Sequence, residues 1–67
     1  MNNIMEEKIY KYLEVVDHSS DSVVKRMDVT EKSWNGLDTL ERGLNRNLNH
    51  EEYFARVTTT NEPLEIF

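Results

Sequence analysis

The chain has 67 residues, enough for one domain that buries only about 60% of the surface its unfolded form exposes. It contains no cysteine, which excludes a disulfide framework and a thiolate zinc site. Its apolar runs are pairs of residues, with one run of three at residues 53–55, too short for a membrane span or a signal-peptide core. We therefore expect a single cytoplasmic domain over residues 1–67, with no membrane association.

The net charge of −5 disfavours non-specific attraction to nucleic acid, because neutralising phosphates requires a surplus of Lys and Arg. The charge is unevenly distributed. Residues 25–50 carry four acids and five bases, whereas the segments before and after them are acidic. The middle of the chain is therefore the part most compatible with a nucleic-acid partner.

The first segment has helical periodicity. Met5, Ile9, Leu13 and Val16 recur at spacings of four, four and three, which is one face of an amphipathic helix. We predict this helix from about residue 3 to residue 16.

A second, shorter helix is predicted over residues 21–27. Val23, Val24 and Met27 lie at i, i+1 and i+4 and would face inward. Asp28 follows in a tight turn, at a position where a left-handed backbone is often needed and is tolerated by aspartate.

A third helix is predicted to begin after Thr30, a good N-cap, and to extend to about Asn47. Asn35-Gly36 is a turn dipeptide, but the residues on both sides of it keep helical spacing, so we retain the helix. Asn45, Asn47 and Asn49 are places where it could end. The apolar residues that repeat along it, and that we expect to face the core, are Trp34, Leu37, Leu40, Leu44 and Leu48.

The tail has two interpretations. Residues 53–60 are rich in aromatic and β-branched side chains, and residues 64–67 alternate after a turn around Asn61, which together predict a β-hairpin. Alternatively, Asn49 and Glu52 have the spacing of a capping box and could open a fourth helix through Val57.

Residues 20–44 resemble the winged helix-turn-helix regulators. The likeness lies in a short helix, a turn ending in Val29-Thr30, a longer helix, and Glu41-Arg42-Gly43-Leu44 before a candidate two-stranded wing. The resemblance implies a mostly α (α+β) fold, with a three-helix helix-turn-helix core and a C-terminal β-hairpin wing.

The resemblance also implies a small, non-enzymatic, DNA-binding transcriptional regulator whose third helix enters a major groove. A homodimer is expected, because one half-site offers limited contact area. The implied DNA-binding residues of the third helix are Lys32, Asn35, Arg42 and Arg46. The implied backbone-contacting residues of the second helix and wing are Lys25, Arg26, Arg56, Thr58 and Thr59.

The acidity supports a different function, a protein-binding module that docks on a basic surface of a partner, in the manner of a small phage-type inhibitor. The carboxylates that would form its surface are Glu6, Glu7, Glu14 and Asp17 in the first segment and Glu51, Glu52, Glu62 and Glu65 in the tail.

Catalysis finds no support in the motifs. There is no Gly-rich phosphate loop, no nucleophile elbow and no metalloprotease motif. His18 and His50 are 32 residues apart without an obvious third ligand. We expect neither an enzyme nor a metal ion or other cofactor.

Overall fold

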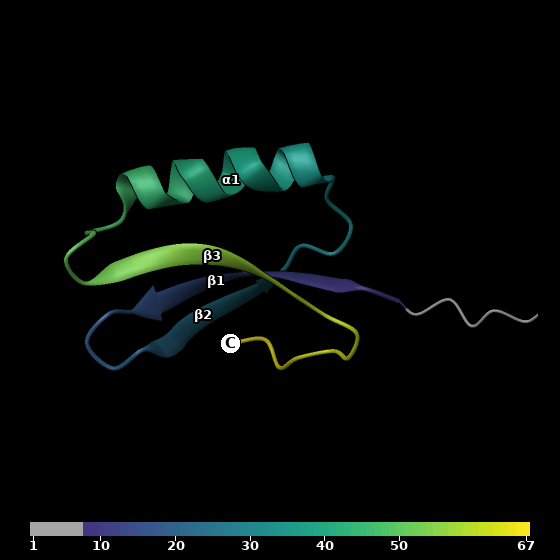
Figure 1. Ribbon diagram of the computed structural model, residues 1–67, viewed down its shortest axis with the longest axis horizontal. Helices are drawn as coiled ribbons and strands as arrows, with labels where there is room; N and C mark the ends of the chain where they lie inside the picture. Colours follow the sequence, from purple (N-terminus) through teal and green to yellow (C-terminus); the bar gives the residue numbers. More distant parts are fainter. Residues whose placement is uncertain (1–7) are drawn as a thin grey trace, which may run out of the picture.

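The computed structural model describes residues 8–67, which form a three-stranded antiparallel sheet with one helix packed on it (Figure 1). The elements in chain order are β1 (Tyr10–Asp17), β2 (Ser22–Asp28), α1 (Trp34–Asn47) and β3 (Tyr53–Thr60). The strand order across the sheet is β2-β1-β3, so the first strand lies in the centre and pairs with both of the others.

Strand β1 is covered on both of its faces. Leu13 points toward α1, whereas Tyr12 and Val16 lie on the opposite face, and none of the three is more than 2% exposed. Its tyrosines and valines are residue types that suit a pleated surface. The apolar run is nearly continuous because a strand between two layers needs no polar face.

A tight turn joins β1 to β2. The Asp17 carboxylate accepts hydrogen bonds from the amide and the hydroxyl of Ser19, and the Asp21 amide donates to the Asp17 carbonyl at 2.7 Å. Asp21 adopts the left-handed backbone that the turn requires, with φ of 59°. A bulge opposite Val15 and Val16 places Val24 outside the regular pairing.

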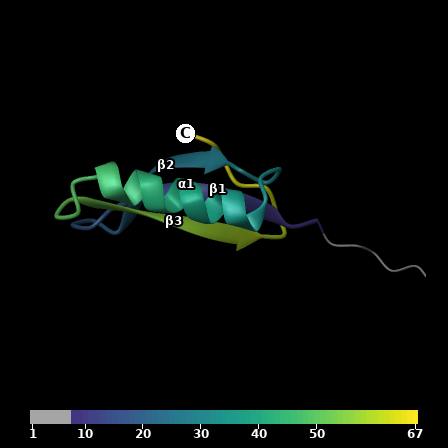
Figure 2. The ribbon, with the colours of Figure 1, turned by 90° about the horizontal axis from the view of Figure 1, so that it is seen from above.

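Helix α1 begins after Ser33, whose Oγ accepts a hydrogen bond from the amide of Gly36 at 3.1 Å. Leu37 is buried against Leu13, Val29 and Ala55, and these four side chains form the core between helix and sheet. In Figure 2 the helix lies over β1 and β3, with β2 to one side.

The C-terminal residues 61–67, here called the strap, cross the sheet face opposite α1 (Figure 1). The Leu64 amide donates to the Tyr12 hydroxyl at 2.9 Å. Nη1 of Arg26 donates to the Glu65 carbonyl at 2.8 Å, and the Arg26 amide donates to the Phe67 carbonyl at 3.0 Å. The strap therefore covers Tyr12 and closes part of the outer edge of β2.

The predicted fold class is wrong, and so is the resemblance to winged helix-turn-helix regulators. Residues 10–16 of the first predicted helix lie in β1, and most of the second predicted helix lies in β2. Residues 3–7 of the first predicted helix lie outside the described residues. Leu13 and Val16 have a helical spacing without a helix, because both faces of β1 are buried and alternation is lost. Ile9 precedes the strand and is 49% exposed, so its match to this spacing is coincidental.

The third predicted helix is confirmed over Trp34–Asn47, including the Asn35-Gly36 dipeptide. Its N-cap is Ser33 and not Thr30, whose amide instead bonds to the Asp28 carboxylate at 3.0 Å. The left-handed residue expected at Asp28 is found at Asp21.

In the tail, a strand over residues 53–60 is confirmed, and the alternative helix through Val57 is wrong. The hairpin wing is also wrong, because β3 pairs with β1 and the residues after Asn61 form no strand. No helix in the described part of the chain is long and apolar enough to cross a membrane.

Candidate functional site

The sheet face opposite α1 holds a buried carboxylate between two arginines. Glu14 on β1 lies directly opposite Arg26 of β2 and Arg56 of β3. Nε of Arg26 donates to Glu14 Oε2 at 2.7 Å, while Arg56 Nε and the Thr58 hydroxyl donate to Oε1 at 2.9 and 2.8 Å. Glu14 is 1% exposed. We call these four residues the Glu14 cluster.

Opposing effects set the pKa of Glu14. Burial raises this pKa because it disfavours the charged carboxylate, but the hydrogen bonds from Arg26, Thr58 and Arg56 and the charge of Arg26 together outweigh burial and hold the pKa below its usual value. Glu14 is therefore ionised at neutral pH. It neutralises one of the two guanidinium charges and ties together all three strands.

The structure scatters the residues predicted to bind DNA. Arg26, Arg56 and Thr58 belong to the Glu14 cluster, and Arg42 on α1 pairs with Asp38 at 2.8 Å. The other predicted residues lie on different segments: Lys25 on β2, Lys32 in the loop before α1, Asn35 and Arg46 on α1, and Thr59 on β3. The helix-turn-helix that would gather them in one groove is absent from residues 8–67, so DNA binding stays a prediction without that support.

One side chain of α1 pairs with the outer edge of β3, the edge that faces away from β1. Nδ2 of Asn45 donates to the Ala55 carbonyl at 3.2 Å, and its Oδ1 accepts from the Ala55 amide at 2.8 Å. The side-chain amide of Asn45 thus bonds to the backbone of β3 as a neighbouring strand would. The flank of α1 that carries Asn45 therefore overhangs this edge.

Three other side chains share that flank. Trp34, Asp38, Glu41 and Asn45 are spaced by four, three and four residues, which returns to the same side of a helix with 3.6 residues per turn. We call these four residues the overhang. It combines a large aromatic side chain, two carboxylates and an amide.

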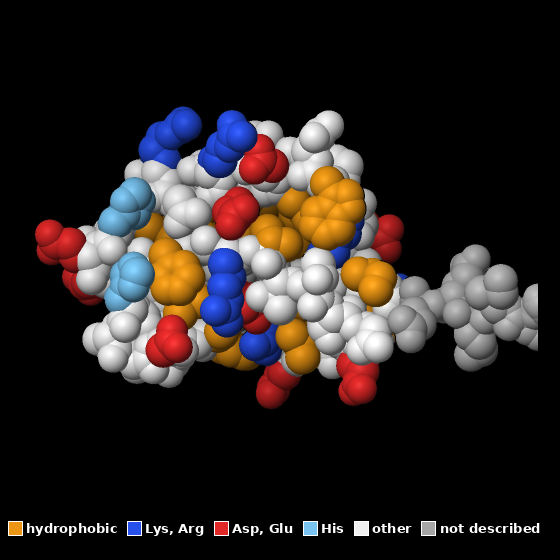
Figure 3. Space-filling view, viewed as in Figure 1, with side chains coloured by type: hydrophobic (Ala, Val, Ile, Leu, Met, Phe, Trp, Pro, Cys, Tyr) orange, Lys and Arg blue, Asp and Glu red, His pale blue; other side chains and the backbone are white. Residues whose placement is uncertain are grey.

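Trp34 is exposed, although the sequence predicts it in the core. It is 60% exposed, and Leu37 fills the core position at this end of the helix. The Lys11 ammonium lies 4.6 Å from the centroid of the indole ring, and Lys11 is the register partner of Thr59 on β3. Trp34 therefore stands over the C-terminal half of β3, and Figure 3 shows hydrophobic side chains reaching the surface at this end of α1.

Carboxylates surround the outer edge of β3. Two belong to the overhang, two come directly before the strand and one comes shortly after it. These residues are Asp38, Glu41, Glu51, Glu52 and Glu62. The edge is therefore bordered by negative charge above it and at both of its ends.

Three cations of α1, β1 and β3 are already engaged with other groups. Arg42 pairs with Asp38, and Arg56 pairs with Glu14. Lys11 lies against the Trp34 ring, and its Nζ donates to the Lys32 carbonyl. The carboxylates along the edge thus keep much of their capacity to attract a basic partner.

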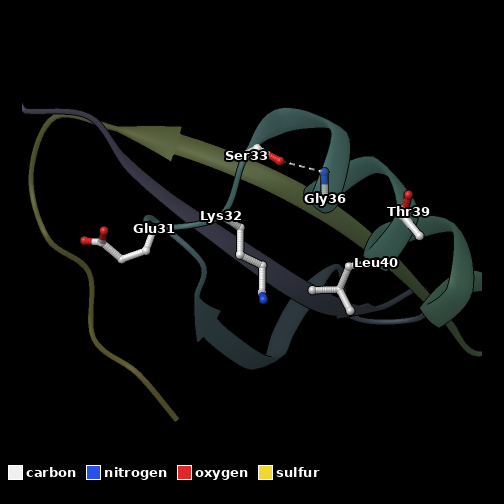
Figure 4. A pocket seen from close by; sticks show the side chains of 6 residues that line it. All are labelled: Glu31, Lys32, Ser33, Gly36, Thr39 and Leu40. Carbon is white, nitrogen blue, oxygen red and sulfur yellow. Dashed lines mark hydrogen bonds between the residues drawn. The ribbon is translucent and has the colours of Figure 1, made fainter.

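A shallow hollow lies on the other flank of α1, lined by Glu31, Lys32, Ser33, Gly36, Thr39 and Leu40 (Figure 4). The Glu31 side chain points away from the others, and the Ser33 hydroxyl is occupied by the Gly36 amide. Few polar groups remain there to orient a small ligand, so we do not assign a function to the hollow.

The two histidines lie at the end of the molecule formed by the β1–β2 turn and the α1–β3 loop (Figure 3). His18 packs on Phe54 with 4.7 Å between ring centroids, and the His50 ring contacts the Asn45 carbonyl. Among residues 8–67, no group of three or more His, Asp or Glu side chains is arranged to hold a metal ion.

Comparisons of the chain with protein-family models, with curated proteins and with solved structures find no match. The chain's own geometry has to support any assignment of function.

Sequence reasoning missed the roles of Glu14 and Asn45. It placed Glu14 on an exposed acidic face, although its neighbours Leu13, Val15 and Val16 are all apolar, a context that signals burial. It took Asn45 only as a place where the helix could end. No local signal reveals the bond of Asn45 to Ala55, because ten residues separate them along the chain.

Proposed function

We propose that this chain is a protein-binding module without chemical activity of its own, and that it docks a basic segment of a partner protein on the side formed by α1 and β3. The exposure of Trp34 carries this proposal. Tryptophan is the residue type most enriched among binding hot spots, and burying its large apolar surface in a complex is strongly favourable.

The fold itself leaves Trp34 available. The core is complete with Leu13, Val29, Leu37 and Ala55, and the contact with Lys11 covers one part of the indole ring. A partner that covers the remaining surface gains apolar burial without repacking this core.

The charge pattern supports a basic partner. The chain has a net charge of −5, and carboxylates border the same edge over which Trp34 stands. Complementary charge steers association and suppresses acidic competitors such as nucleic acids. We therefore expect the partner segment to be rich in Lys or Arg.

Fluorescence anisotropy with three labelled probes tests the proposal. The probes are random-sequence peptides rich in Lys and Arg, random-sequence peptides rich in Asp and Glu, and pooled random duplex DNA, each titrated at low and moderate salt. We expect binding of the basic peptides alone, weakening with salt. Binding of DNA in preference to the basic peptides, or of no probe at all, would contradict the proposal.

Matched variants locate the binding surface. Trp34→Ala should weaken binding of the basic peptides about tenfold or more, whereas Val24→Ala, at an exposed apolar residue on β2, should not. Glu41→Gln should weaken it more than Glu65→Gln, since Glu65 belongs to the strap on the opposite side. Equal effects of Trp34→Ala and Val24→Ala, and of Glu41→Gln and Glu65→Gln, would show that the binding surface does not lie on α1 and β3.

A further inference from the structure

We infer that the partner segment binds in an extended conformation as a fourth strand, hydrogen-bonded to the outer edge of β3 at Val57 and Thr59. This inference rests on the proposed function and specifies how the basic segment is held. It follows from the direction of the backbone groups along β3.

The bonds at the start of β3 show which residues face outward. The Tyr53 amide bonds to the Asn49 carbonyl at 2.8 Å, and both backbone groups of Ala55 bond to Asn45. In an antiparallel ladder, alternate residues turn their amide and carbonyl to the same side. Val57 and Thr59 therefore also point these groups away from β1.

The second half of the edge lacks the cover that the first half has. Asn49 and Asn45 bond to Tyr53 and Ala55, but within the described range no protein group bonds to the outward amides or carbonyls of Val57 and Thr59. An edge of this kind is a template for another strand.

The overhang makes the open edge at Val57 and Thr59 selective for a basic strand. Side chains of an added strand alternate between the two sheet faces, so every second one would lie beneath α1. There it would meet the exposed Trp34 and the carboxylates of Asp38 and Glu41. A lysine or arginine suits both, because its stem packs on the indole while its charge reaches a carboxylate.

A decapeptide of alternating Lys and Val is the probe, and Trp34 is the reporter, because it is the single tryptophan of the chain. We expect the peptide to shift the Trp34 emission to shorter wavelength. In a second peptide series, N-methylation of every second residue removes the amides on one edge. Methylation of the residues whose amides face β3 should weaken binding about tenfold or more. Methylation of the alternate residues, whose amides face away, should leave binding unchanged.

Two variants test the edge from the side of the protein. Thr59→Pro removes an outward amide and leaves the β1–β3 ladder intact, which is the position at which a strand tolerates proline. Thr59→Ala shortens the side chain but keeps the amide. We expect Thr59→Pro to weaken binding of the decapeptide about tenfold and Thr59→Ala to leave it nearly unchanged.

The outcomes separate this inference from the proposed function. If basic peptides bind but the two N-methylated peptides, methylated at alternate sets of residues, bind equally well, the proposed function stands and strand addition is refuted. The N-methyl series decides this even if Thr59→Pro fails to fold. If Trp34 emission shifts with protein concentration in the absence of peptide, a second copy of the chain covers the edge, and the inference of a foreign basic strand is overturned.

Discussion

The two faces of the sheet are buried by different chemistry. Beneath α1, Leu13, Leu37 and Ala55 make an aliphatic core, whereas beneath the strap the buried groups include the ionised Glu14 with its two arginines. Apolar burial is non-directional and does not titrate. A buried ion cluster depends on geometry and on pH. We therefore expect the helix face to supply most of the stability and the strap face to fix the pairing of the strands.

Leu37→Ala should have the largest effect. Leu37 is 1% exposed at the centre of the helix-side core, and truncating such a leucine costs about 2–5 kcal/mol of unfolding free energy. Chemical denaturation measures the loss. Leu40→Ala is the matched control on the same helix, since Leu40 is 37% exposed and should lose much less. Equal losses would show that the core is not centred on Leu37.

Glu14→Gln should have the second largest effect, a loss of about 1–3 kcal/mol of unfolding free energy. The substitution removes the charge that both arginines share while keeping the shape of the side chain. Arg56 is nearly half exposed and can turn to water, which limits the cost. Denaturation under the same conditions as for Leu37→Ala checks the ranking. A variant as stable as the parent would show that the cluster contributes no net stability.

Acid should weaken the buried Glu14 cluster and leave the aliphatic core beneath α1 unaffected. The pKa of Glu14 in the folded chain lies below its ordinary value of 4.5, so its contribution to stability is present above that pH and is lost as the pH falls through the folded-state value. Asp17 and Asp28, whose pKa values are lowered by hydrogen bonds from Ser19 and Thr30, act in the same direction.

Denaturation between pH 7 and pH 3 tests this dependence. On acidification, Glu14→Gln should lose less unfolding free energy than the parent does. Leu37→Ala should lose as much as the parent. If Glu14→Gln loses as much unfolding free energy with falling pH as the parent, the acid sensitivity belongs to other carboxyl groups.

Asn45→Ala should cost about 0.5–1.5 kcal/mol, because the Ala55 amide and carbonyl exchange a protein partner for water at an accessible edge. The change also lengthens the open part of β3. Thermal denaturation gives the stability change. A loss as large as that of Leu37→Ala would mean that Asn45 has a role in the core that its contacts do not indicate.

Gly43→Ala should have the smallest effect and the opposite sign. An added Cβ meets no atom within 4 Å, and glycine inside a helix costs up to about 1 kcal/mol relative to alanine. The variant should be slightly more stable than the parent in thermal denaturation. Gly36→Ala is the contrast, since its Cβ would lie 3.3 Å from the Ser33 hydroxyl that caps the helix.

The sequence predicts the elements whose signals are local. Helix α1 repeats its leucines at helical spacing, and β3 is dense in β-branched residues. Both elements are found close to where these patterns indicate them. The candidate site includes parts of both. Thr59 was predicted as a contact to the DNA backbone in a wing, which is a different function and a different structure from the strand edge described above.

Strand β1 was mistaken for a helix for a physical reason. A central strand covered by a helix and by the strap carries apolar residues on both faces, and Leu13 and Val16 then match a helical spacing by coincidence, as does the exposed Ile9 before the strand. The pairing of β1 with β3 joins residues more than 35 positions apart, such as Asp17 and Tyr53, and no local pattern encodes it. The open edge, and the overhang above it, depend on that pairing.

Amide hydrogen exchange along β3 tests the central claim most directly. In the free chain we expect slow exchange at Thr58, whose amide faces β1, and fast exchange at Val57 and Thr59, which face outward. Adding the alternating Lys-Val decapeptide should slow exchange at Val57 and Thr59. Protection of these two amides before any peptide is added, or unchanged exchange in its presence, would contradict an open edge that accepts a basic strand.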